Sequence, residues 1–360
     1  MKTYLFSPLD TWFFRDGRPY NQNELNQAEI SSIFPPPVTG MVGGMRSALA
    51  MSQGWSGRGD WPEKIKNILG DRADLAGLRF IGPNLLLDNT PVFPAPSILL
   101  GHSESFITRL RPGLPLRCDL GNVRLPFAEQ PREDLKELAD KWLTLNGMQQ
   151  VLAGGVPDIQ EVMTSSSLWS HENRVGIERN YTSRVVNEGM LYATGHIRLN
   201  KNVNVALSVK GLPDGWEPVT PSGLGGEGRM TWIEPYSGVL PLPVAQVTPA
   251  RDGYLRYIVV LSTPADLPVW PTQGDVLPGL PGHIVLGCIG RPQRLGGWDS
   301  LDRKPSPLKP LIPAGSVWFM EAEANLVEQV KSLHGAHIGQ RTEWGFGQIF
   351  IGTWKEENQS

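Results

Sequence analysis

The spacing of hydrophobic residues along the chain switches between the period of a β-strand and the period of an α-helix. Residues 3–9 alternate apolar and polar side chains, as a half-buried strand does. Further strand-like runs are predicted at residues 78–87, 190–199, 203–209, 254–262, 283–289, 316–322 and 348–354. The tight polar link at 200–202 joins two of these runs, which predicts that they form a hairpin.

One helix is predicted inside residues 31–52, where apolar side chains recur every three or four positions after three consecutive prolines. Proline lacks an amide hydrogen, so it fits the first turn of a helix but not its interior. Gly40, Gly43 and Gly44 each weaken this helix by about 1 kcal/mol relative to alanine. We expect a close approach of the helix to a strand or a ligand to compensate for that cost.

Two further helices are predicted from stripes of apolar residues. The first covers residues 132–146 and is closed by Gly147, and its stripe consists of Leu135, Leu138, Ala139, Trp142 and Leu145. The second covers residues 323–334 and is closed by Gly335.

Helices and strands in this order, with antiparallel hairpins between them, are typical of an α+β protein. The pattern favours two ferredoxin-like (RRM-like, βαββαβ) units with large insertions and β-hairpins. The N-terminal unit is expected at residues 1–210 with an insertion at about 56–170, and the C-terminal unit at 211–360. A glycine-rich loop at 339–347 then precedes a central strand, and we expect its backbone amides to face phosphate groups.

The composition indicates a globular protein that is rich in turns. The 360 residues are 40% hydrophobic and include 40 glycines, 32 prolines and 12 tryptophans, which argues against a helical bundle and against wholesale disorder. The formal net charge is −3, so any nucleic-acid site must be a local basic surface.

Sequence motifs for catalysis, metals and cofactors are absent. Cys118 and Cys288 are the only cysteines, which excludes a disulfide framework and fits a reducing compartment. The six histidines form no HExxH pattern, and there is no P-loop, GxGxxG fingerprint or GxSxG nucleophile turn. With no signal peptide and no membrane-spanning apolar run, we expect a cytoplasmic protein without a metal, a cofactor or a membrane partner.

Arginines cluster with aromatic residues and glycines in four stretches: WFFRDGRPY at 12–20, HENRVGIERNYTSRVVNEGMLYATGHIRL at 171–199, GRPQRLGGWD at 290–299, and the glycine loop. Guanidinium groups pair with phosphates and aromatic faces stack on unpaired bases, so these clusters predict binding of single-stranded RNA. Simpler structural interpretations remain open: an ion-paired turn at 15–18, a capped turn at 173–177, a hairpin turn at 225–229 and a packing role for Trp298.

Six motifs occur in the order that characterises one family: SPLDTWFFRDGRPY, FPPPVTGMVGGMRSAL, NRVGIERNYTSRVVNEGMLYATGHIRL, GGEGR, LGGWD…KPLIPAGSVWF and WGFGQIFIG. On these motifs the chain resembles the subunit-three family of the Cmr complex, the type III-B CRISPR RNA-guided effector, within the RAMP superfamily. The resemblance covers residues 4–352, which is nearly the whole chain.

The resemblance implies a double ferredoxin-like protein that binds the 5′ handle of a CRISPR RNA in antiviral defence and is not itself a nuclease. It also implies contacts with the large polymerase-like subunit and with the adjacent backbone RAMP subunit. One alternative is a metal-independent RAMP endoribonuclease that processes guide RNA, and another is an adaptor whose arginines pair with acidic proteins. RAMP nucleases usually place a histidine near the N-terminal unit, whereas the first histidine here is His102.

Carried over residue by residue, the resemblance and the arginine clusters give a set of candidate RNA-binding residues. The glycine loop contributes Arg341, Gly345, Phe346 and Gly347. The rest of the chain contributes Arg15, Arg18, Arg46, Asn173, Arg174, Val175, Gly176, Ile177, Thr182, Arg184, Arg294 and Trp298.

Overall fold

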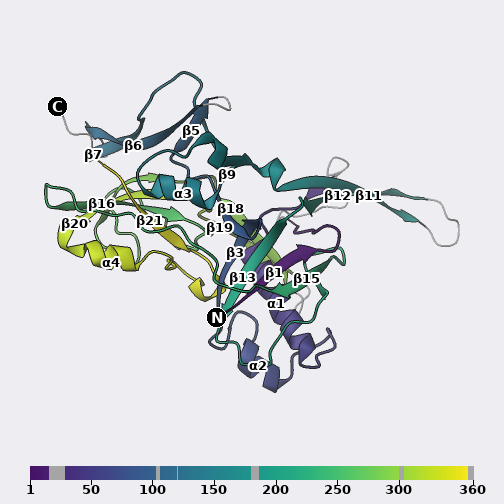
Figure 1. Ribbon diagram of the computed structural model, residues 1–360. Helices are drawn as coiled ribbons and strands as arrows, with labels where there is room; N and C mark the ends of the chain where they lie inside the picture. The colour runs from purple at the N-terminus through teal and green to yellow at the C-terminus, as the bar shows by residue number, and fades with distance from the viewer. Residues whose placement is uncertain (16–28, 103–105, 120, 180–185, 300–303, 356–360) are drawn as a thin grey trace. The chain divides into compact units, whose positions relative to one another are not determined.

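The chain divides into two compact units that are each discontinuous in sequence (Figure 1). The computed structural model describes residues 1–15, 29–102, 106–119, 121–179, 186–299 and 304–355. Unit 1 consists of Met1–Asn89, Ser166–Gly238 and Arg294–Pro310, and unit 2 of Thr90–Ser165, Val239–Gln293 and Leu311–Ser360. Two consecutive halves were expected from the sequence, whereas in the structure residues 90–165 group with the C-terminal strands.

Unit 1 is built on an antiparallel sheet with the strand order β3-β13-β1-β15-β14. Its elements are β1 (Lys2–Pro8), β2 (Glu29–Ser31), α1 (Val38–Ser52), α2 (Glu63–Leu69), β3 (Arg79–Leu87), β11 (Trp169–Arg179), β12 (Val186–Leu199), β13 (Val203–Lys210), β14 (Ser222–Gly223) and β15 (Met230–Pro235). The two-stranded sheet of β18 (Gln293–Asp299) and β19 (Lys304–Leu311) also belongs to unit 1, except for the first residue of β18 and the last residue of β19.

The predicted helix of the N-terminal region is α1, which begins directly after three consecutive prolines, the last of which, Pro37, is its N-cap. Met41, Val42, Met45 and Leu49 are fully buried on one side of it, as their helical spacing predicts. Gly44 lies so close to Leu224 that an added Cβ would be 2.5 Å from its Cδ1. The close neighbour at Gly44 is thus a side chain, whereas the expectation was close approach to a backbone, and the nearest backbone atom, the Gly223 carbonyl oxygen, would be 3.8 Å from the added Cβ.

A separate sheet of unit 1 consists of the long ribbon β11–β12 and the short strand β2. β12 pairs antiparallel with β11 from Leu199 to Val186, and in parallel with β2 only at Ala193–Gly195. The ribbon thus extends from unit 1 as a two-stranded arm over most of its length.

Unit 2 contains the four-stranded antiparallel sheet β17-β20-β16-β21 and a second four-stranded sheet, β7-β6-β5-β8. Its elements are β4 (Thr90–Pro94), β5 (Leu99–His102), β6 (Phe106–Cys118), β7 (Gly121–Ala128), β8 (Lys136–Glu137), β9 (Lys141–Leu143), α3 (Leu145–Leu152), β10 (Val162–Thr164), β16 (Tyr254–Leu261), β17 (His283–Cys288), β20 (Val317–Glu323), α4 (Val327–Ser332) and β21 (Ile349–Thr353).

Both faces of the sheet β17-β20-β16-β21 are buried in unit 2. Leu255, Tyr257 and Val259 of β16 pack into one hydrophobic cluster with Val330 of α4. Ile258 and Val260, which point the other way, pack into a second cluster that contains α3. This two-sided burial explains why β16 is a continuous apolar run rather than an alternating one.

The central strands of the two units are connected in the same way. In chain order, unit 1 uses β1, β3, β13 and β15, and unit 2 uses β16, β17, β20 and β21. In both sheets the first strand lies between the third and the fourth, and the second is next to the third, all antiparallel. Unit 1 has its helix α1 after the first strand, and unit 2 has α4 after the third.

Two expectations about local structure are wrong. Residues 132–146 do not form one helix, because they contain β8 and β9, and α3 begins only at Leu145, where the Thr144 hydroxyl accepts a hydrogen bond from the Gly147 amide at 3.1 Å. Gly147 is therefore inside a helix rather than closing one. β12 and β13 also form no hairpin, since β12 pairs with β11 while β13 pairs with β1 and β3.

Within the part of the chain that the structure describes, no helix combines the length and the apolar character needed to cross a membrane.

Candidate nucleic-acid interface

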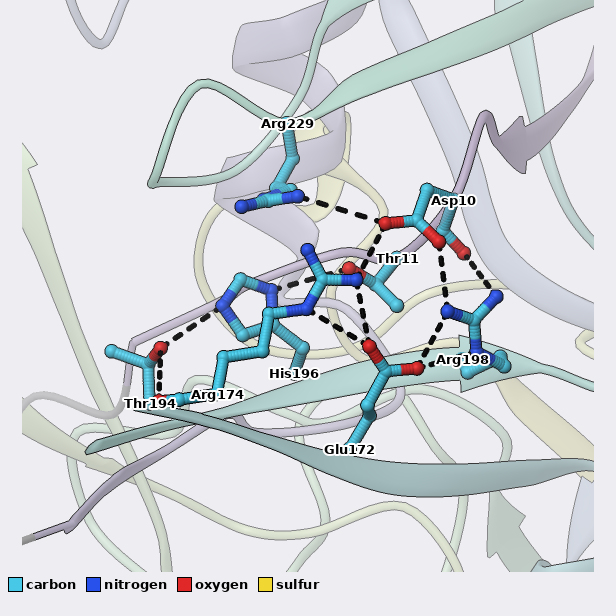
Figure 2. A network of polar contacts seen from close by, with 8 residues as sticks. All are labelled: Asp10, Thr11, Glu172, Arg174, Thr194, His196, Arg198 and Arg229. Atoms are coloured by element: carbon cyan, nitrogen blue, oxygen red, sulfur yellow. Dashed lines mark hydrogen bonds and ion pairs between the residues drawn. The ribbon is translucent and has the colours of Figure 1, made fainter. Parts of the chain in front are cut away.

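Three arginines and two carboxylates of unit 1 form one network of ion pairs (Figure 2). Arg174 donates from Nη2 to Asp10 Oδ2 at 2.5 Å and from Nε to Glu172 Oε1 at 2.9 Å. Arg198 donates to the other oxygen of each carboxylate, at 2.7 Å to Asp10 Oδ1 and 2.6 Å to Glu172 Oε2. Arg229 Nη1 lies 3.8 Å from Asp10 Oδ2. Three guanidinium groups against two carboxylates leave one positive charge in excess.

Strand pairing places four of the side chains of this site on one face of the ribbon. Glu172 is directly opposite His196, Arg174 opposite Thr194, and Ser170 opposite Arg198. Residues two apart in a strand point to the same side, so Glu172, Arg174, His196 and Arg198 share a face.

The segment after β1 brings Asp10 to this face. Trp12 exchanges two backbone hydrogen bonds with Ile197 of β12, at 2.9 and 2.8 Å, and its side chain is fully buried. This bridge fixes Asp10 and Thr11 directly beside the ribbon (Figure 2).

Arg229 comes from the turn between β14 and β15, which lies against the same N-terminal segment. The Gly226 amide donates to the Phe13 carbonyl at 2.8 Å. Gly225 has a φ of +82°, and an added Cβ would lie 2.5 Å from the Phe13 carbonyl oxygen. A glycine is therefore required at position 225 for the turn to approach closely enough to bring Arg229 to Asp10.

His196 lies beneath the charged groups and is only 1% exposed. Its Nδ1 is 3.2 Å from the Thr11 hydroxyl and its Nε2 is 3.1 Å from the Thr194 hydroxyl (Figure 2). Burial, followed by the nearby Arg229 and Arg174, lowers the pKa of His196 below its ordinary value. The imidazole is therefore a neutral packing and hydrogen-bonding group at neutral pH.

The carboxylates of the network are held in their charged form. Hydrogen bonds from Arg174 and then Arg198 lower the pKa of both Asp10 and Glu172. The same pairs raise the pKa of Arg174 and Arg198. The charge distribution is thus fixed across the physiological pH range.

The network has hydrogen-bonding capacity left for an anion. Arg229 Nε is buried without a hydrogen-bond partner among the described residues, and its only ion pair there is the long one to Asp10. The three guanidinium groups are all partly exposed. Partly exposed guanidinium groups that carboxylates hold in place match the fork geometry that phosphate oxygens accept.

The segment 173–177 lies on β11, which excludes the alternative interpretation of this segment as a capped turn. Asn173 and Val175 are exposed, and they alternate with Arg174, which belongs to the ion-pair network. Gly176 and Ile177 continue the strand. Thr182 and Arg184 lie outside the described residues.

The other N-terminal candidates are dispersed. Arg15 is exposed at a bridge to Ser32, and Arg18 lies outside the described residues. Arg46 is 5% exposed and donates to the carbonyls of Leu69, Arg72 and Asp74. The contact with RNA expected of Arg46 does not fit this arrangement, because its guanidinium holds α1 to the following loop.

The glycine-rich loop of unit 2 is closed on itself. The Gly347 amide donates to the Pro264 carbonyl at 2.8 Å and the Gly345 amide to the Thr342 carbonyl at 3.0 Å. Arg341 donates to Asp266 at 2.8 Å and lies over the ring of Phe346, which is 1% exposed. These amides face carbonyls rather than solvent and the ring offers no open face, so neither the amide cradle nor the stacking role expected here fits this arrangement.

The last two candidates belong to β18. Arg294 is exposed near its start, and Trp298 lies close to its end. Among the members of the set that the structure describes, Arg174 alone joins the ion-pair network of unit 1.

Sequence reasoning missed Asp10 and Glu172 and gave Arg229 no part in a site with Arg174. It placed Arg198 in the same arginine cluster as Arg174, at 171–199, but not among the candidate RNA-binding residues. Glu172 and Arg174 are two residues apart on β11, and His196 and Arg198 are two residues apart on β12. That these four side chains share one face becomes visible only once the two strands are paired. Among the described residues, no group of three or more His, Cys, Asp or Glu side chains could hold a metal ion.

Comparison with known proteins gives one family and several structures. The family model described as CRISPR-associated protein (Cas_Cmr3) matches residues 4–354. No curated protein matches the chain.

A chain in the cryo-EM structure of the Type III-B Cmr-beta bound to cognate target RNA is 14% identical, with a TM-score of 0.53 over 97% of this chain and 96% of that one. A chain of a second such structure, with AMPPnP, is 16% identical, with a TM-score of 0.49 over 92% and 89%. The first of these likenesses shows that the fold is shared.

Proposed function

Since the chain belongs to the CRISPR-associated Cas_Cmr3 family, we propose that it serves in a type III-B RNA-guided effector complex as the subunit that binds the 5′ handle of the CRISPR RNA. The ion-pair network of Asp10, Glu172, Arg174, Arg198 and Arg229 supports this role. It is a local cationic site on a protein whose net charge is −3. The handle's phosphates bind the partly exposed guanidinium groups and compete with Asp10 for them.

The proposal includes a non-catalytic role. His196 is the histidine closest to the charged network, but both of its ring nitrogens are bonded to threonines and it is almost inaccessible. A general acid or base must reach the proton that it transfers. A metal-independent endoribonuclease is therefore the alternative outcome of the test below rather than a second proposal.

Two further parts of the proposal concern architecture. The shared strand order of the two units is that of a ferredoxin-like βαββαβ unit, with the second helix absent from unit 1 and the first helix absent from unit 2. The partners proposed are the large polymerase-like subunit and the adjacent backbone RAMP subunit. In such an assembly these two subunits contribute part of the binding site for the handle RNA, which then contacts more than one chain.

The test compares two guide RNAs in complexes assembled with the wild-type chain or a variant. One RNA is the guide that co-purifies with the native complex, and the other lacks its 5′ handle. Arg174→Ala is expected to weaken binding of the handle RNA about tenfold, as loss of a charge-assisted hydrogen bond does. Asp10→Asn is expected to strengthen it, because a negative charge that competes with phosphate is removed.

Arg79→Ala is the matched control, since Arg79 is an exposed arginine of β3 in the same unit. Equal affinity for the two RNAs in the wild-type complex would refute handle binding. Site-specific cleavage of the guide precursor by the purified chain without metal, abolished by His196→Gln, would replace the scaffold role with the nuclease.

A further inference from the structure

The strands β6 and β7 of unit 2 pair to form an antiparallel ribbon (Figure 1), and four large apolar side chains of this ribbon are exposed. Leu114 is 65% exposed, Leu116 51%, Leu125 56% and Phe127 46%. Contiguous apolar surface of this kind is rare on monomeric soluble proteins and marks sites of interaction. The remaining strands of that sheet are β5 and β8, which pair with the other end of β6.

A β-bulge assembles this face. The pairs Pro112–Pro126 and Pro115–Arg124 differ in register by one residue, so two residues of β6 oppose Leu125. Beyond the bulge Leu116 is opposite Val123, which points to the same side as Leu125 and Phe127. Without the extra residue, Leu114 and Leu116 would point to the other face of the ribbon.

Gly113 makes the bulge possible. A Cβ at this position would lie 2.9 Å from the Leu125 carbonyl oxygen. The sequence thus keeps a residue without a side chain at the one position where the strands must come this close. The collection of four large apolar side chains on one face is a built feature of the ribbon.

The edge of β7 is blocked against pairing with another strand. Pro126 has no amide hydrogen, and the Arg124 amide donates to the Gln273 side chain at 3.1 Å. A partner therefore contacts the side chains of the face rather than extending the sheet.

Charges on the ribbon indicate what the partner presents. In sequence, the described part of β6, β7 and their turn contains the buried Arg109, the more accessible Arg111, Arg117 and Arg124, and one acidic residue, Asp119. Arg111 lies over the Phe127 ring, 5.4 Å from its centroid, at the border of the apolar face. Three of the four exposed apolar side chains are aliphatic and offer no surface for base stacking, which favours a protein over RNA.

We propose that the apolar face of β6 and β7 docks a second protein subunit of the effector complex, through an apolar surface rimmed by aspartate and glutamate. This inference rests on the proposed function only for the identity of the complex that supplies the partner. It assigns docking to unit 2 and leaves RNA binding to the network in unit 1.

The test uses the full chain, co-expressed with the other subunits of its complex and purified through a tag on one of them. We expect Leu116→Asp combined with Leu125→Asp to lower incorporation of the chain at least about tenfold, because each change buries an unpaired charge. Val276→Asp is the control, since Val276 is an exposed valine in a loop of the same unit. Arg117→Glu is expected to weaken incorporation most at low salt.

Carbene footprinting of the wild-type chain gives a readout that needs no variant to fold. Labelling of residues 114–127 is expected to fall several-fold in the complex relative to the isolated chain. Unchanged labelling, or full incorporation of the double variant, overturns the proposal. Crosslinks between this ribbon and the guide RNA would also overturn the proposal. The same holds if the double variant changes only the self-association of the chain and not its incorporation into the complex.

The two roles fail separately. The isolated double variant is expected to bind handle RNA with the affinity of the wild-type chain. The Arg174→Ala chain is expected to show the wild-type fall in labelling of residues 114–127 when it enters the complex. If the wild-type complex binds the two RNAs equally while its ribbon is protected, the proposed function alone is refuted. If the complex prefers the handle RNA while its ribbon is labelled as in the isolated chain, the docking site alone is refuted.

Discussion

Three arginines from the candidate set perform three different tasks. Arg46 is buried and bonded to backbone carbonyls, and burial lowers its pKa to about 10. Arg341 neutralises Asp266, a carboxylate that is fully buried. Arg174 is partly exposed, and so is Glu172, while its other partner Asp10 is exposed. The residue type alone does not distinguish these cases, because what differs is the partner and its access to water.

Replacing Arg341 by alanine is expected to destabilise unit 2 more than it affects RNA. The change leaves Asp266 buried without its guanidinium partner, which costs on the order of 3 kcal/mol. The measurement is the thermal melting temperature of the full chain, and Arg291→Ala is the exposed control. An unchanged melting temperature with weaker RNA binding would restore the phosphate-binding role of this arginine.

His334 gives unit 2 a dependence on pH. The Ile351 amide donates to Nδ1 at 3.0 Å, so the ring keeps its proton on Nε2, which is 2.6 Å from the Pro243 carbonyl oxygen. Burial lowers the pKa of His334 in the folded state. Below the ordinary pKa the unfolded chain takes up a proton that the folded chain does not, so stability falls as pH falls.

The expected result is a smaller loss of melting temperature between about pH 7.5 and about pH 5.5 for His334→Gln than for the wild type. Glutamine keeps a donor for Pro243 but cannot be protonated. His171→Gln, at an exposed histidine, is expected to show the wild-type loss. Equal losses in all three proteins would contradict a neutral His334.

At the level of elements, the periodicity of hydrophobic residues located most strands and α1, but it did not predict which strands pair with each other. The run of 190–199 is a strand, yet its partner is β11 rather than the strand that follows it. The stripe at 132–146 satisfied helical spacing, but Phe93 of β4 pairs with Leu143 of β9 and draws that segment into a sheet. Tertiary pairing overrides local spacing in such short segments.

Two adjacent glycines of α1 should respond oppositely to alanine. Gly43 has no neighbour within reach of an added Cβ, so Gly43→Ala is expected to stabilise by about 0.5–1 kcal/mol. Gly44→Ala forces its Cβ against the buried Leu224 and is expected to destabilise by about 1 kcal/mol net. Chemical denaturation measures both, and a gain at Gly44 equal to that at Gly43 would contradict the packing.

At the scale of the whole molecule, the motif order identified the family, and the match over residues 4–354 confirms it. The net charge of −3 confines any electrostatic attraction for RNA to local sites. The network of Figure 2 is such a site, because neighbouring carboxylates orient its arginines without neutralising all of them.

Salt dependence reports how many of these arginines contact phosphate. With Arg174, Arg198 and Arg229 all changed to alanine, the slope of log affinity against log salt for handle RNA is expected to become shallower by roughly 2. The control replaces Arg58, Arg79 and Arg251, which are exposed elsewhere. An unaltered slope in the first triple variant would mean that the handle binds at another surface.

The sequence by itself determined the family, the α+β class, the positions of most strands and the local nature of any RNA site. These follow from the order of motifs, from side-chain periodicity and from charge, which are properties of neighbours along the chain. The tertiary structure decided that Phe346 is buried, that Arg46 and Arg341 are internal partners, and that Asp10, Glu172 and Arg229 join Arg174. Asp10 and Arg174 are 164 positions apart and Arg341 and Asp266 are 75 apart. Even the contacts between residues closer in sequence depend on how the chain folds back on itself, which no local pattern records.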